Sequence, residues 1–334
     1  MRRITLNNTS LQTSPLGFGC VSLTLHDDPA KAVAILNEAL DQGVTHFDVA
    51  RLYGFGQAEA IVGEFLRGKR DRVTVTTKFG LQPNESLAKH RRLVSFARKV
   101  VHKFPALRKI INRGSGSMMK SGAFDPAEAA ASLAKSLAEL KTDYIDLYML
   151  HEASPTDAQR PDLIEFLERE VQKGTIRHYG VASGYHAMQD DLRLFPPSYR
   201  VFQFDHHAGS QNAQRVAGAS DRGLVTFGTM QVGKTLIAAA QADAGLARQF
   251  GERVGHDLSD PKAIRALLLH EALAVNANGI VLFGTTSRAH LRENVAMAGS
   301  PTPPSAAQLD AFREFARAAT TNPAGVHAAA GARG

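Results

Sequence analysis

The chain has 334 residues, which is enough for one large domain or two ordinary ones with a full-sized core. Apolar residues make up 44% and charged residues 21%. These values exclude a disordered or fibrous chain. Cys20 is the one cysteine, so an internal disulfide and a thiolate metal cage are also excluded.

The net charge of +7 comes from one segment of the chain. No acidic residue lies between Glu85 and Asp125, where ten lysines and arginines occur. Because ten exceeds the net charge of the whole chain, the remainder is mildly acidic. A basic surface for nucleic acid is therefore not expected outside this segment, and no nucleic-acid partner is predicted.

The start of the chain and its apolar runs indicate whether the protein carries a secretory signal or a membrane span. MRRITLNNTSLQTSP has two arginines but no apolar stretch after them, unlike a secretory signal. The apolar runs, such as 279–284, are far shorter than the roughly 20 residues that span a bilayer. We expect a cytoplasmic protein without a membrane span, as a monomer or small homo-oligomer.

Short β-branched runs alternate with amphipathic stretches along most of the chain, which is typical of parallel βα units. Helical periodicity is found at 30–42, 57–67, 126–140 and 161–173. Eight strands are predicted around these helices, at 16–20, 44–48, 73–77, 144–150, 177–181, 200–204, 223–227 and 279–283. This arrangement predicts an α/β fold, the (β/α)8 TIM barrel.

A doubly wound sheet is the competing architecture, and it carries a G-x-G-x-x-G turn after its first strand. Here Gly17 and Gly19 are followed by Ser22 at the third position, so that turn is missing. We expect a single barrel domain over 1–321 and a flexible tail at 322–334, which is rich in Gly and Ala.

The barrel pattern is interrupted at 81–124, after the third strand. Apolar residues recur at helical spacing from Leu93 to Phe104, and most basic residues fall elsewhere on the helical wheel. A basic helical insert on the catalytic face is therefore predicted. Its role stays open between a solvated surface, a lid over the pocket, and a surface for an anionic membrane or a protein partner.

Four ionisable residues stand at the carboxyl ends of three neighbouring strands, which form the active face of a barrel. Asp48 ends the second strand, with Tyr53 five residues on; Lys78 ends the third, and the fourth runs into His151. Any one of these residues could occupy a strand end for a structural reason, such as capping a turn or packing in the core. Together they predict an acid–base group in which Lys78 lowers the pKa of Tyr53 and Asp48 keeps Lys78 protonated. His151 would hold a carbonyl or relay a proton.

The sequence resembles the aldo-keto reductase superfamily over residues 10–300, through LGFGC, FDVARLYG, TTKFG, SLAKSLAELKTDYIDLYMLH, GTIRHYGVAS and VLFGTTSRAHLRENV. The resemblance implies a (β/α)8 oxidoreductase that reduces carbonyls or oxidises alcohols with a nicotinamide cofactor, as an NADP-dependent alcohol dehydrogenase does. It implies a small carbonyl or alcohol substrate and no metal. The family's tetrad carries over onto Asp48, Tyr53, Lys78 and His151, with Tyr53 exchanging the proton.

The cofactor contacts implied by the resemblance are less complete. The family's Ser-Asn pair and Gln, which hold the carboxamide, correspond to Ala182, Ser183 and Gln203. Arg288, at a helix start, favours NADP(H) over NAD(H) by holding a phosphate. The remaining implied contacts are Phe227 against the nicotinamide, Gly228 and Thr229 at the pyrophosphate, and Gly284, Thr285 and Asn294 in the loop after the eighth strand.

Two other functions stay open at this stage. One is a cofactor-binding partner protein like the β subunits of potassium channels, which have a related barrel. The other is a P-loop nucleotide hydrolase, because GTMQVGKT at 228–235 matches G-x-x-x-x-G-K-[ST]. The pattern names no particular substrate; the pocket candidates Leu23, Phe55 and Phe79 indicate only a partly apolar pocket.

Overall fold

The computed structural model describes residues 1–26, 28–83, 119–121, 124–189 and 192–321. Eight parallel strands close into a barrel in chain order, with the last strand paired to the first. This confirms the predicted (β/α)8 fold, and each strand lies within two residues of its predicted range. The barrel strands are β3 (Leu16–Gly19), β4 (His46–Asp48), β5 (Thr74–Phe79), β8 (Ile145–His151), β9 (Ile176–Ala182), β10 (Val201–Asp205), β11 (Gly223–Phe227) and β12 (Ile280–Phe283).

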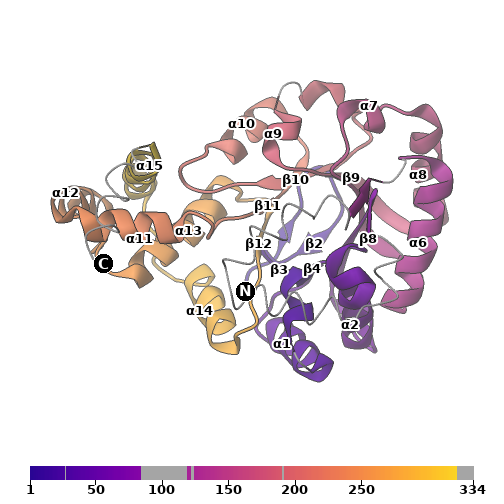
Figure 1. The fold of residues 1–334 in the computed structure, drawn as a ribbon, viewed down its shortest axis with the longest axis horizontal. Helices are drawn as coiled ribbons and strands as arrows, with labels where there is room; N and C mark the ends of the chain where they lie inside the picture. The colour runs from indigo at the N-terminus through magenta and orange to yellow at the C-terminus, as the bar shows by residue number, and fades with distance from the viewer. Residues whose placement is uncertain (27, 84–118, 122–123, 190–191, 322–334) are drawn as a thin grey trace.

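Helices surround the barrel in Figure 1. Among the residues that the structure describes, the helices between β3 and β11 or directly after β12 are α1 (Pro29–Asp41), α2 (Gln57–Leu66), α6 (Pro126–Leu140), α7 (Pro155–Ala158), α8 (Pro161–Lys173), α9 (Tyr185–Met188), α10 (Asn212–Ala219) and α14 (Arg288–Ala298). Short 3-10 helices cover Cys20–Leu25, Tyr53–Gly56, Arg70–Arg72 and Leu192–Leu194. Within the described ranges, none of the helices has the length and apolar character that a bilayer-crossing helix needs.

Four further helices form a layer on one side of the barrel, at the left of Figure 1. They are α11 (Gly233–Ala242), α12 (Ala244–Val254), α13 (Pro261–Val275) and α15 (Ala306–Thr321). Their apolar faces share a cluster of their own, centred on Leu236, Leu268, Phe312 and Phe315. The layer therefore has a core of its own, and Leu269 and Ala272 of α13 also join it to the main core cluster.

Two predicted helices, α6 and α8, match the structure to the residue because their end signals are strong. Asp125 precedes α6 and accepts a hydrogen bond from the backbone N–H of Glu128 at 2.9 Å, while Pro126 needs no donor in the first turn. Gly174 ends α8 with φ of 77°, a conformation that glycine adopts without steric cost.

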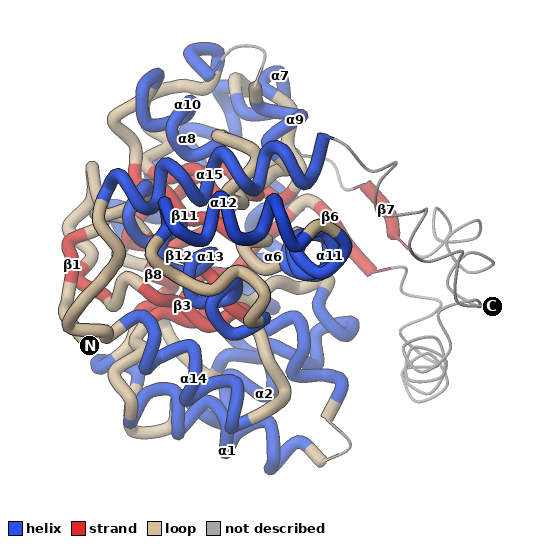
Figure 2. Tube along the Cα trace, turned by 90° about the vertical axis from the view of Figure 1, so that its left-hand side faces the viewer, coloured by secondary structure: helices blue, strands red, loops and turns tan. Residues whose placement is uncertain are grey.

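The segment after β5 begins and ends in a small sheet that the sequence pattern does not indicate. β6 (Leu81–Pro83) pairs antiparallel with β7 (Met119–Ser121), at the edge of the molecule in Figure 2. Strands of three residues are too short to show an alternating pattern. The helices predicted inside this insert, and the tail predicted at 322–334, lie outside the described residues.

The floor of the barrel is closed by a hairpin of β1 (Ile4–Thr5) and β2 (Gln12–Thr13). Its apolar side chains join the side chains of the inner barrel face in one cluster. That cluster contains Ile4, Leu6, Leu11, Leu147, Met149, Ala182, Val201, Val225, Ile280 and Leu282. The opposite end of the barrel, at the carboxyl ends of the strands, is left for a pocket.

Gly17 on β3 lies in a crowded part of the inner face of the barrel. A methyl group there would come within 2.8 Å of both Ile280 and Leu282 and within 3.0 Å of His46. We therefore expect Gly17→Ala to lower the free energy of unfolding by about 1–3 kcal/mol, as overpacking of a core does. Urea denaturation measures this loss. Gly218→Ala in α10 is the control, because nothing lies within 4 Å of the added methyl. Equal stabilities of the two variants would contradict the crowding argument.

Candidate active site

The predicted residues Asp48, Tyr53 and Lys78 meet at the carboxyl ends of β4 and β5. The Lys78 ammonium donates to Asp48 Oδ1 at 2.6 Å, to the carbonyl oxygen of Val49 at 3.2 Å and to Tyr53 Oη at 3.4 Å. A lysine ammonium has three donors, so each donor has an acceptor. With only 1% of Lys78 exposed, this charge is fixed in place under the phenol of Tyr53.

Burial and neighbouring charges shift the pKa values of Lys78 and Tyr53 in opposite directions. Burial acts to lower the pKa of Lys78, but the Asp48 carboxylate and the Tyr53 phenol outweigh it, so the pKa is raised and the ammonium persists at neutral pH. Burial raises the pKa of Tyr53 more than Lys78 lowers it. The expectation of a lowered Tyr53 pKa was therefore wrong in its net direction, although Lys78 acts in the expected sense.

His151 ends β8 and faces Tyr53 across the pocket. The two rings are perpendicular, at 85°, with centroids 6.3 Å apart. Burial, helped by the charge of Lys78, lowers the pKa of His151 to about 3. The neutral ring carries one N–H donor and one acceptor nitrogen, and its Nδ1 is buried without a hydrogen-bond partner in the described structure. His151 can therefore act as an uncharged donor at neutral pH.

A cavity of about 460 Å³ opens over these four residues. Five predicted cofactor residues also line it: Ser183, Gln203, Phe227, Gly228 and Gly284. Four others, namely Thr229, Thr285, Arg288 and Asn294, do not line it. Residues 228–235, which match the phosphate-loop pattern, form the turn after β11 and the first turn of α11. Lys234 is exposed there. Gly228 lines the cavity, whereas Gly233 and Lys234 do not.

The polar atoms around the cavity suit the nicotinamide cofactor that the sequence implies. Gln203 Oε1 and Ser22 Oγ are buried and have no hydrogen-bond partner among the described residues. Buried polar atoms in proteins are nearly always paired, so both are placed to bind a polar ligand group. Gln203 would accept from the carboxamide, and the half-buried ring of Phe227 would lie against the nicotinamide.

Arg288 is engaged elsewhere in this structure. Its Nε donates to one carboxylate oxygen of Glu38 on α1, and Arg292 Nε donates to the other at 2.6 Å. Two guanidinium groups thus share one carboxylate at the start of α14. The pairing joins residues 250 positions apart, which no local sequence pattern indicates. The phosphate contact of Arg288 stays a prediction.

Two of the three predicted pocket residues belong to the core instead. Leu23 is fully buried, and Phe79 is 1% exposed and stacks on Tyr148 with centroids 4.8 Å apart. Successive residues of a strand point to opposite faces, so Lys78 facing the pocket turns Phe79 outward. The side chain of Phe55 lies outside the described structure.

Sequence reasoning missed several residues that line the cavity, including Val21, Glu152 and Gln231. Glu152 directly follows His151, and its position next to a predicted catalytic residue was the available signal. Val21 and Gln231 come from the loops after β3 and β11, whose paths depend on tertiary packing. No local pattern indicates which loop side chains reach the pocket.

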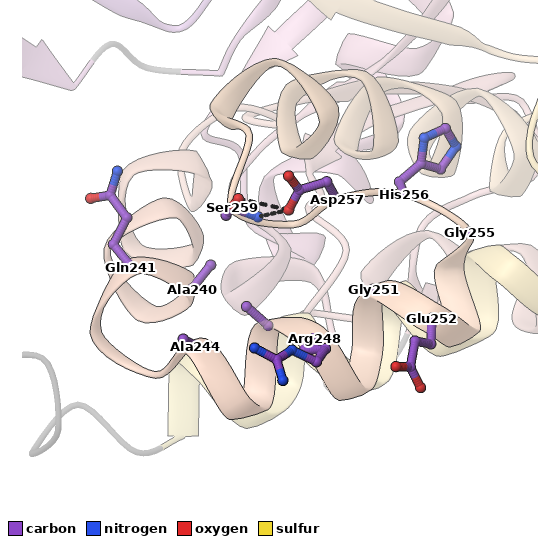
Figure 3. A pocket seen from close by; sticks show the side chains of 11 residues that line it. Ala240, Gln241, Ala244, Arg248, Gly251, Glu252, Gly255, His256, Asp257 and Ser259 are labelled. Carbon is purple, nitrogen blue, oxygen red and sulfur yellow. Dashed lines mark hydrogen bonds between the residues drawn. The ribbon is translucent and has the colours of Figure 1, made fainter.

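A larger cavity, of about 700 Å³, lies between α11, α12 and the loop before α13 (Figure 3). Its lining is mostly small side chains with Arg248 and Glu252, and the Asp257 carboxylate there accepts hydrogen bonds from the N–H and hydroxyl of Ser259 at 2.8 and 2.7 Å. In the described part of the chain, no three His, Cys, Asp or Glu side chains are grouped to hold a metal. The smaller cavity is the better candidate for catalysis because Asp48, Tyr53, Lys78 and His151 line it, and none of them lines the larger one.

His46 lies two residues before Asp48 and is fully buried beneath it. Its Nδ1 and Nε2 are hydrogen-bonded to the hydroxyls of Thr74 and Thr76, at 2.9 and 3.2 Å. Burial, with a contribution from Lys78, lowers the pKa of His46 to about 3. Like His151, it is a neutral ring under acidic conditions in which an exposed histidine is charged.

A testable consequence concerns stability in acid. Below pH 6.5 the unfolded chain binds a proton at His46 while the folded chain does not until about pH 3, so the free energy of unfolding falls as the pH falls through this window. In this window we expect the free energy of unfolding of His46→Gln to fall less steeply with pH than that of the wild type, by about 1.4 kcal/mol per pH unit. Urea titrations between pH 6 and 4 give the slope for each protein. Parallel slopes for the two would contradict a neutral His46.

Comparison with known proteins identifies relatives of this chain. The model of the Aldo/keto reductase family matches residues 15–199. The uncharacterized oxidoreductase YqkF of Bacillus subtilis (strain 168) is 32% identical over 185 residues, which is 55% of this chain and 49% of that protein. The chain thus spans about half the length of the curated relatives it matches.

Solved structures resemble the whole fold at lower identity. The holo form of aldo-keto reductase AKR11C1 from Bacillus halodurans has a TM-score of 0.69 and 22% identity, covering 94% of this chain and 96% of that one. An aldo-keto reductase from Klebsiella pneumoniae, solved in complex with NADPH, has a TM-score of 0.65 and 21% identity, covering 95% and 96%. At this identity the likeness supports the fold alone.

Proposed function

Because this chain belongs to the Aldo/keto reductase family, we propose that it is an NADP(H)-dependent oxidoreductase that reduces the carbonyl group of an aldehyde, ketone or sugar, or oxidises the corresponding alcohol. The choice of NADP(H) is supported by the Klebsiella pneumoniae relative in fold, which was solved with NADPH. The bound nicotinamide would supply the hydride.

Tyr53 is the proposed proton donor to the carbonyl oxygen. Its raised pKa keeps the phenol protonated at neutral pH, as a donor must be. Once the proton has left, the phenolate would lie beside the Lys78 ammonium, 3.4 Å from Tyr53 Oη. Lys78 thus stabilises the charge that develops during the reaction rather than one present at rest.

Asp48 and His151 support this step in different ways. The Asp48 carboxylate holds the ammonium through the 2.6 Å hydrogen bond. His151, neutral and half-buried at the other side of the cavity, would hold the substrate oxygen near Tyr53 with an uncharged N–H. A charged imidazolium beside Lys78 would be disfavoured electrostatically, so the neutral ring suits both its surroundings and its role.

One observation carries the proposal: a single buried ammonium contacts both a carboxylate and the only phenol lining the described cavity. This arrangement gives a tyrosine the means to lose a proton and regain it. The four side chains come from three neighbouring strands and the loop after β4, so the barrel itself sets their spacing.

The test replaces the phenol. Tyr53→Phe should lower the rate of NADPH-dependent reduction of aldehydes by at least about 100-fold, the usual contribution of a positioned general acid. The variant should still bind NADPH, which is measured by the change in NADPH fluorescence on binding. Tyr144→Phe is the matched control, because the Tyr144 hydroxyl contacts the carbonyl of Arg70 near the foot of the barrel.

Full activity of Tyr53→Phe would refute the assignment of the proton donor. Tight NADPH binding by the wild-type protein without turnover across aldehydes, ketones and sugars would instead indicate a cofactor-binding partner protein. Both measurements use the same purified chain, so they separate the two functions directly.

A further inference from the structure

Glu152 is placed at the pocket by an uncommon backbone conformation. Its φ is 60°, in the left-handed region that few residues other than glycine adopt. In an extended strand, two successive side chains would point to opposite faces. Because the chain turns at Glu152, both His151 and Glu152 line the same cavity. The backbone strain thus accompanies a carboxylate at the mouth of the active site.

Two hydrogen bonds fix this residue. The backbone N–H of Glu152 donates to the carbonyl oxygen of Ala182 at 2.8 Å. Its Oε2 accepts from the N–H of Gly184 at 3.4 Å, next to Ser183 in the loop after β9. The side chain itself is exposed. The carboxylate is therefore tethered at the rim while one oxygen remains available to a ligand.

The charge balance of the cavity makes this carboxylate important. Asp48 and Lys78 form a buried ion pair and largely cancel each other. His151 is neutral, with its pKa near 3. Among the described residues that line the cavity, Glu152 is the one charge without an ion-pair partner. A substrate entering the cavity meets a local charge of −1 from these residues.

We propose that Glu152 is a specificity-determining residue that favours substrates bearing a positively charged group, such as a quaternary or primary ammonium beside the carbonyl, and disfavours carboxylate-bearing ones. This inference rests on the proposed carbonyl reduction and adds the substrate class. A neutral polyhydroxy substrate, which could also donate hydrogen bonds to the carboxylate, is the alternative that the experiment must separate.

The experiment uses two substrates of the same shape. Betaine aldehyde carries a trimethylammonium group, and 3,3-dimethylbutanal has a neutral carbon in place of that nitrogen. Each would take a hydride at carbon and a proton at oxygen while NADPH is oxidised to NADP+. We measure the ratio of their kcat/KM values for the wild type and for Glu152→Gln, which keeps the side-chain shape and removes the charge.

We expect Glu152→Gln to lower the cation-to-neutral ratio about five-fold at low ionic strength, the upper end of what an exposed ion pair contributes. Activity on the neutral isostere should stay nearly unchanged. In the wild type, the preference for the cation should shrink as NaCl is added, because the charge is exposed. Glu165→Gln on α8, another exposed glutamate, is the control and should leave the ratio unchanged.

A binding measurement makes the inference independent of turnover. Choline and 3,3-dimethyl-1-butanol are the alcohols that correspond to the two aldehydes, and calorimetry reports their affinities for the NADP+-loaded and the free protein. Weaker choline binding by Glu152→Gln, with unchanged binding of the neutral alcohol, supports the inference. Equal cation-to-neutral ratios in the wild type and in Glu152→Gln overturn it. It is also overturned if Glu152→Gln loses as much affinity for glyceraldehyde as for choline, because the carboxylate would then recognise hydroxyl groups. Absence of turnover with both aldehydes would count against the proposed function only.

Discussion

The buried ion pair between Lys78 and Asp48 is the interaction on which the rest of the active site depends. Burying either charge alone costs several kcal/mol, and removal of one partner of such a pair typically costs about 3–5 kcal/mol. The fold meets this cost by placing the two residues on adjacent parallel strands, β4 and β5. It then supplies the remaining donors of the ammonium with the Val49 carbonyl and the Tyr53 phenol. The pair is stable only where the barrel holds all of these groups together.

The inner face of the barrel differs from one side to the other, and the ion pair lies on the polar side. Beneath it, His46 is hydrogen-bonded to hydroxyls of Thr74 and Thr76, and Thr74 is in turn bonded to Thr13 at 2.9 Å. The strands from β8 to β12 instead contribute an apolar cluster. The ion pair thus lies above neutral hydroxyl and imidazole groups, and Gln203 of β10 adds a polar side chain at the level of the pocket.

Most of the fold could be predicted from the sequence because its signals are local. Strands and helices follow from periodicity, and α6 and α8 from capping residues. The acid–base residues could be predicted because each ends a strand and parallel strands align their ends. The net pKa direction of Tyr53 could not, since burial is a property of the assembled pocket. Nor could the pairing of Arg288 with Glu38, which joins distant segments, or the left-handed turn at Glu152, where the residue type is not glycine.

The hairpin that closes the barrel floor has a consequence for the order of folding. Arg2 and Asn7 donate hydrogen bonds to the carbonyl oxygens of Ala277, Asp221 and Asn278, and β3 pairs with β12. The two side-chain hydrogen bonds of the hairpin therefore join segments that lie 275 and 214 positions apart in the chain. Such long-range contacts slow folding through the entropy of loop closure. We therefore expect the closure of the barrel floor to be a late step in folding, after neighbouring strands such as β3, β4 and β5 have paired.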